Sequence, residues 1–116
     1  FILAGYNNEN YGYLAGYAYA DTKEYRKFYW DKCEAISDSL KMIPEASGLY
    51  VHSQFLLGVM KSGTKAKFLS SAIKLNEKSA QYFESVMTAT EGQNTSLFRI
   101  FAAIWLKKFN EEKQKH

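Results

Sequence analysis

The chain has 116 residues, of which 47% are hydrophobic, 16% aromatic and 23% charged. This is the length of one ordinary domain, and the apolar fraction is too high for a disordered chain. The net charge of +3 comes mostly from lysines spread along the sequence, which is a weak indication of an anionic partner, and we expect no nucleic-acid binding. One cysteine and two histidines exclude an intramolecular disulfide and a Cys/His zinc site, so we expect no metal and no cofactor.

Residues 1–20 form a segment rich in tyrosine and glycine. Leu3-Ala4-Gly5-Tyr6 returns eleven residues later as Leu14-Ala15-Gly16-Tyr17. Because the asparagines between Asn7 and Asn10 disfavour a helix, we predict a short or frayed helix followed by one or two turns from about residue 11. Tyrosine is enriched at protein interfaces. We therefore predict partner-binding roles for Tyr6, Tyr11, Tyr13, Tyr17 and Tyr19.

Two helices follow on either side of the single proline. Asp21 and Glu24 have the spacing of a capping box, which predicts a helix starting there. Its apolar stripe is Tyr25, Phe28, Tyr29, Cys33, Ile36, Leu40 and Ile43. Pro44 suits the first position of the next helix, and residues 46–60 predict a second helix that is largely buried.

The second half of the chain predicts two more helices. Thr64 is a suitable cap for a helix from residue 65 to about 90, with Asn76 on or beside its apolar stripe and Gly92 as its stop. Residues 97–109 are apolar on nearly every side, which predicts the central helix of the core; the run is too short to span a membrane. Residues 110–116 are expected to be a charged, frayed tail.

Arg99 is the one polar residue between Leu97 and Leu106. A cation in an apolar helix must reach solvent, pair with an acid such as Glu84 or Glu91, or face a partner chain. We therefore count Arg99 among the candidate partner-binding residues. Since no segment alternates with a period of two, the sequence predicts an all-α fold, a four- to five-helix bundle that forms a single domain over residues 1–116.

The sequence offers little for catalysis. Gly58 to Lys65 approximates a phosphate-binding loop, but the order of the final lysine and hydroxyl is reversed and a helix precedes it. A weaker anion site at a helix N-terminus would use Lys61, Thr64, Lys65 and Lys67. Cys33 lies on an apolar stripe and His52 is the only plausible general base, predicted at the edge of the core, so we expect no enzyme.

Two functions fit these patterns. The first is a non-enzymatic protein-binding module, such as an inhibitor, an immunity-type protein or an adaptor, whose partner is another protein or a second copy of the chain. The alternative is a carrier or sensor of a small apolar ligand, lined by Phe55, Met60, Phe83, Phe98, Phe101 and Trp105. We expect a soluble protein without a membrane span; the sequence leaves the compartment, cytoplasmic or exported, open.

Overall fold

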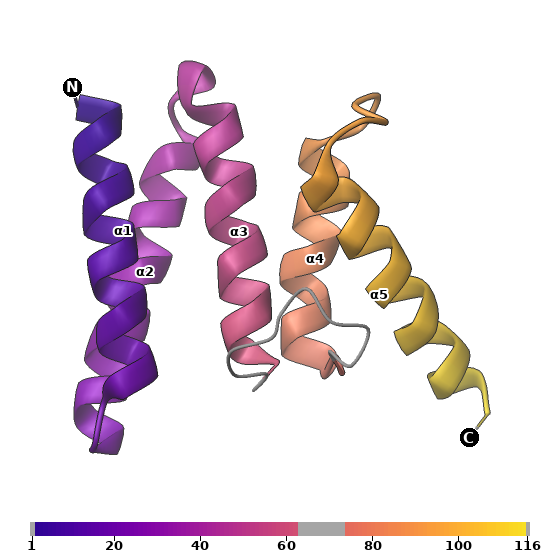
Figure 1. Ribbon diagram of the computed structural model, residues 1–116, viewed down its shortest axis with the longest axis horizontal. Coiled ribbons are helices and arrows are strands. Elements are labelled where there is room, and N and C mark those ends of the chain that lie inside the picture. The colour runs from indigo at the N-terminus through magenta and orange to yellow at the C-terminus, as the bar shows by residue number, and fades with distance from the viewer. Residues whose placement is uncertain (1, 63–73, 116) are drawn as a thin grey trace. The chain divides into compact units, whose positions relative to one another are not determined.

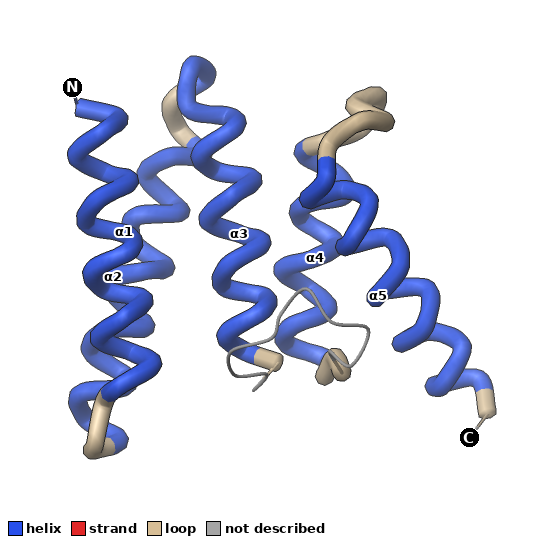
Figure 2. The backbone as a smooth tube through the Cα atoms, in the orientation of Figure 1, coloured by secondary structure: helices blue, strands red, loops and turns tan. Residues whose placement is uncertain are grey.

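A computed structural model describes the backbone of residues 2–62 and 74–115, and side chains from residue 9 onward within those ranges. This part of the chain is helical and contains no strand (Figures 1 and 2). Its elements are α1 (Ile2–Tyr19), α2 (Lys23–Lys41), the 3-10 helix η1 (Pro44–Ala46), α3 (Ser47–Lys61), α4 (Glu77–Ala89) and α5 (Leu97–Gln114). The all-α prediction is confirmed. None of the described helices has the length and apolar character needed to cross a membrane.

The contacts within the chain group into two units, residues 1–53 and 54–116, and the boundary falls inside α3. Unit 1 holds α1, α2, η1 and the first half of α3. Unit 2 holds the second half of α3, α4 and α5. Each unit has its own buried residues, described below, and the single domain stays a prediction.

α1 is one continuous helix, so the predicted interruption at residues 7–10 is wrong. An asparagine costs a helix less than about 0.7 kcal/mol, and packing against α2 outweighs that cost. Asn10 and Leu14 are both buried. The approach of the two helices is close at Gly16, where a Cβ atom would lie 2.7 Å from the Tyr29 ring.

α2 begins one residue later than predicted. The cap is Thr22, whose Oγ1 accepts a hydrogen bond from the backbone nitrogen of Tyr25 at 3.1 Å; Asp21 as the cap is therefore wrong. The buried face of the helix is Trp30, Cys33, Ile36, Ser37 and Leu40. The predicted stripe is thus confirmed over the second half of the helix, whereas its first turns differ, as described for the candidate site.

A pair of buried serines joins α2 to the first half of α3. The Oγ atoms of Ser37 and Ser53 lie 2.6 Å apart. Ser53 Oγ also donates to the Tyr50 carbonyl at 2.7 Å. Pro44 occupies the first turn of η1, as predicted, and turns the chain between these two helices.

α4 begins at residue 77, so a helix running from residue 65 is wrong: residues 74–76 are not helical, and Thr64 lies outside the described residues. Asn76 is the cap rather than a member of the stripe. Its side-chain oxygen accepts from the Ser79 backbone nitrogen, and Ser79 Oγ accepts from the Asn76 backbone nitrogen, each at 2.8 Å. Its Nδ2 also donates to the Lys61 carbonyl at 2.9 Å, which ties α4 to the end of α3.

Aromatic rings form the core of unit 2. Phe55, Phe83 and Trp105 contact one another with ring centroids 5.4–5.6 Å apart. Phe98 and Phe101 extend the cluster at 5.0 Å from Phe55 and 5.5 Å from Trp105. This cluster holds α5 against α3 and α4 by one side only.

The opposite side of α5 is open, so the prediction of a fully surrounded central helix is wrong. Leu97, Ile100 and Ile104 are 66%, 40% and 56% exposed. The helix also continues to Gln114, past residue 110 where a frayed tail was expected. Apolar residues therefore occupy more of the circumference of α5 than the neighbouring elements of unit 2 bury.

Candidate functional site

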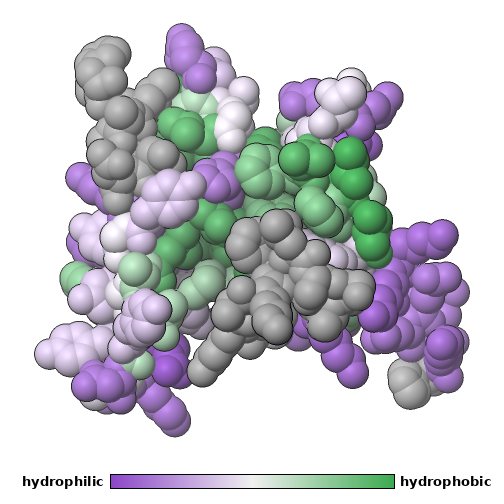
Figure 3. All heavy atoms as spheres, viewed as in Figure 1, coloured by the Kyte–Doolittle hydropathy of each residue, from purple (hydrophilic) through white to green (hydrophobic). Residues whose placement is uncertain are grey.

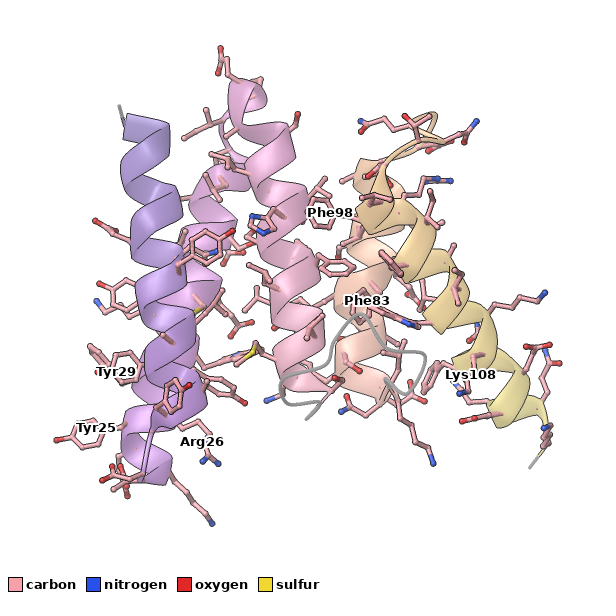
Figure 4. All side chains as sticks on the ribbon, in the orientation of Figure 1. Tyr25, Arg26, Tyr29, Phe83, Phe98 and Lys108 are labelled. Carbon is pink, nitrogen blue, oxygen red and sulfur yellow. The ribbon has the colours of Figure 1, made fainter. Side chains whose placement is uncertain are left out.

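Two exposed aromatic side chains of unit 1 lie at the start of α2. Tyr25 is 59% exposed and Phe28 50% exposed. Phe28 contacts the ring of Tyr29 at 5.3 Å between centroids, and Tyr29 approaches Tyr13 of α1 at 6.4 Å. Figure 4 shows Tyr25 and Tyr29 projecting on the same side of α2. We call these four residues the aromatic surface.

Local packing explains why these rings stay outside. Trp30, which lies outside the predicted apolar stripe, is buried and packs against Tyr17 in a tilted arrangement, with ring centroids 5.0 Å apart. The inward face of α2 therefore carries Trp30 and Cys33. Tyr25 and Phe28 lie on another side of the helix, outside the core. The expectation that both are buried is wrong. The sequence does indicate this outcome. With Trp30 beside Tyr29, the aromatic stripe is wider than one neighbouring helix can cover.

Of the five tyrosines predicted to bind a partner, the four whose side chains are described do not all face the same way. Tyr13 and Tyr17 face α2, while Tyr11 and Tyr19 are exposed. The side chain of Tyr6 lies outside the described residues. Partner binding by these residues stays a prediction, and the structure adds Tyr25, Phe28 and Tyr29 as aromatic side chains beside them.

Tyr11 and His52 form a polar contact between α1 and α3. The Tyr11 hydroxyl and His52 Nε2 are 3.2 Å apart, and the rings meet edge to face at 5.6 Å between centroids. Burial lowers the pKa of His52, which favours the neutral form of its ring. His52 lies at the edge of the core, as predicted, in a half-buried position.

Cys33 has the environment of a structural thiol. It is fully buried, and burial raises its pKa to about 12. A reactive cysteine needs the opposite shift, toward the thiolate, from a nearby cation or helix N-terminus. Within the part of the chain that the structure describes, no three histidine, cysteine or acidic residues gather as a metal site.

Arg99 serves the end of a neighbouring helix. Its Nη1 donates to the Met87 carbonyl at 2.8 Å and to Thr90 Oγ1 at 3.2 Å, at the C-terminus of α4. Thr90 Oγ1 in turn donates to the Val86 carbonyl at 2.7 Å. The cation thus satisfies carbonyl groups that a helix end leaves without intrahelical partners. This role was not among the three that the sequence analysis considered; a role in partner binding stays a prediction.

The weak anion site falls mostly outside the described residues, which include Lys61 but not Thr64, Lys65 or Lys67. The residues expected to line a ligand pocket largely contact one another, since the rings of Phe55, Phe83, Phe98, Phe101 and Trp105 fill the middle of unit 2. A cleft beside Trp105 and Lys108 has a volume of about 10 Å³. That is room for about one water molecule.

Comparison with protein families, with characterised proteins and with solved structures gives no match to this chain. Its class is therefore set by its own residues: an all-α protein whose described surface includes an aromatic face on unit 1 and an aliphatic face on unit 2.

Proposed function

We propose that this chain is a non-enzymatic protein-binding module, of the inhibitor, immunity-type or adaptor kind, and that it binds its partner through the aromatic surface. The observation that supports the proposal is the exposure of Tyr25 and Phe28, each at least 50% open in a unit that has an apolar core of its own. Aromatic side chains supply large contact areas at a small loss of side-chain entropy, and they dominate the energetics of protein interfaces.

The backbone beneath the surface suits this role. Thr22 caps α2 just before Tyr25, and the Tyr29 ring rests on the bare backbone of Gly16. Rings held on a capped helix lose little freedom on binding, so more of their contact energy is retained as affinity. Lys32 lies over the Phe28 ring, with its Nζ 5.4 Å from the centroid, and gives the apolar surface a charged border.

Site-specific photocrosslinking tests the proposal. A benzophenone amino acid replaces Phe28 in the full chain, and a control chain carries it at Gln81, which is exposed on α4. After irradiation in extract of the source cells, we expect a specific adduct from position 28 and none from position 81. The adduct is identified by mass spectrometry and the complex is rebuilt from purified components.

The rebuilt complex gives the decisive measurement. Because aromatic hot spots contribute about 2 kcal/mol or more each, Tyr25→Ser with Phe28→Ser should weaken binding at least about tenfold. Lys23→Ala, an exposed change on the same helix, should leave affinity unchanged. Identical adducts from positions 28 and 81, or an affinity that ignores the double substitution, would overturn the proposal.

A further inference from the structure

The outer side of α2 carries two parallel rows of exposed residues with a seven-residue repeat. Phe28, Ala35 and the C-cap residue Met42 form the apolar row, and Met42 is 82% exposed. Glu24, Asp31 and Asp38 form an acidic row beside it, and all three are exposed. Residues seven apart on a helix stay on one side, with a drift of about 20° per repeat. We call these two rows the α2 seam.

α5 presents the complementary pattern. Leu97, Ile100 and Ile104 are exposed at spacings of three and four, the spacing of a coiled-coil ridge. Lys107 and Lys108 follow on the same side, with Glu111 one turn further. Figure 3 shows the change along the helix, from green hydrophobic side chains over its first half to purple polar ones over its second. We call Leu97, Ile100, Ile104, Lys107 and Lys108 the α5 ridge.

The two units differ in charge. Residues 1–53 carry five basic and seven acidic side chains, a net charge of −2, whereas residues 54–116 carry ten basic and five acidic, a net charge of +5. Two seams brought together would place acids against acids, and two ridges would place lysines against lysines. A seam and a ridge attract each other, because acids accompany the apolar residues of the seam and lysines accompany those of the ridge.

We infer that the α2 seam is covered by the α5 ridge of a second copy of this chain. Leucine and isoleucine of the ridge pack between Phe28, Ala35 and Met42, while the lysines face the acidic row. Asp31 already pairs with Lys27 at 2.7 Å, but both side chains are more than half exposed, and such surface pairs exchange partners at little cost. Each copy has one seam and one ridge, and a dimer that uses both surfaces of each copy forms two such contacts. The inference rests on the proposed function, because Phe28 belongs to both surfaces.

Charge reversal tests the pairing. One variant carries Glu24→Lys, Asp31→Lys and Asp38→Lys; another carries Lys107→Glu and Lys108→Glu. Native mass spectrometry and sedimentation at low salt should show the unmodified chain as a dimer, and each variant alone should dissociate at least about tenfold more readily. Mixing the two variants restores the dimer, since each seam then meets a ridge of opposite charge. The control Glu9→Lys with Glu45→Lys changes exposed acids outside the seam and should leave dimerisation intact.

The crosslinker at position 28 separates this inference from the proposed function. An adduct of two copies, joined between α2 and α5, supports both. An adduct with a different protein, with the chain monomeric at every concentration, overturns the inference and leaves the proposed function standing. A crosslink between α2 and α5 at the mass of one chain, or a dimer indifferent to the charge reversals, also overturns the inference. No adduct at all contradicts both.

Discussion

The Phe83 ring lies on the bare backbone of Gly58, where a Cβ atom would stand 2.9 Å from the ring. Phe83 is fully buried and is held between Phe55 and Trp105, so it has no room to withdraw. Gly16 receives the Tyr29 ring in the same way in unit 1. Each unit thus uses a glycine within a helix to admit an aromatic ring.

Gly58→Ala should destabilise the protein by about 1–3 kcal/mol, because the added methyl group overpacks a fixed ring. Gly12→Ala is the matched control. Its Cβ atom would meet nothing within 4 Å, and replacing a glycine inside a helix should stabilise it by about 0.5–1 kcal/mol. Urea unfolding followed by circular dichroism measures both. Equal effects of the two substitutions would show that the contact at Gly58 does not limit packing.

Arg99→Ala should cost about 1.5–3 kcal/mol, the usual contribution of hydrogen bonds from a charged donor. Asn110→Ala, an exposed change on the same helix, should alter stability by less than about 0.5 kcal/mol. Because the acceptors of Arg99 are a carbonyl and a hydroxyl, high salt should leave its effect unchanged. If salt removes most of the difference, the important partner is instead an acid such as Glu84 or Glu91.

Asn76→Ala should destabilise α4 by about 1–2 kcal/mol through loss of its cap. Asn76→Asp retains the acceptor for the Ser79 backbone nitrogen but removes the Nδ2 donor to the Lys61 carbonyl. The loss in Asn76→Asp relative to the unmodified chain, in thermal unfolding, therefore measures the link between α3 and α4, and the further loss in Asn76→Ala measures the cap. Equal losses for alanine and aspartate would mean that this link, rather than the cap, carries the stability.

The pKa of His52 predicts a loss of stability in weak acid. Burial holds this pKa below its ordinary value of 6.5, so the unfolded chain binds the proton more readily than the folded one. Stability should therefore fall as the pH drops below about 6.5. His52→Gln should flatten the change between about pH 8 and pH 5, measured by urea titration at each pH. His116 is present in both proteins and cancels in the comparison; parallel profiles would contradict the prediction.

Local patterns predict the ends of helices well where residues adjacent in the sequence determine them. The stop at Pro44 and the turn at Gly92, which has a φ of +84°, both depend on a few adjacent residues. The wrong predictions concern residues whose conformation or burial depends on packing between helices. The asparagines of α1 are helical because α2 covers that helix.

The aromatic surface was missed for a related reason. Periodicity gives the width of an apolar stripe but not which part of it the neighbouring helix covers. Tyr25 and Phe28 lie on nearly the opposite side of α2 from Trp30, and the position of α1 selects Trp30 for the core. The role of Arg99 depends on the end of α4 lying beside α5, a relation between elements that no spacing within α5 encodes.

The buried hydroxyl pair of Ser37 and Ser53 has a consequence for how α2 and α3 choose their relative rotation. Apolar side chains would accept several rotations of one helix against the other at similar energy. A rotation that separates the hydroxyls breaks the hydrogen bond between Ser37 and Ser53, and the lost bond raises the energy of that rotation. The pair therefore adds little to the total stability, but it gives one alignment of the two helices a lower energy than the alignments next to it.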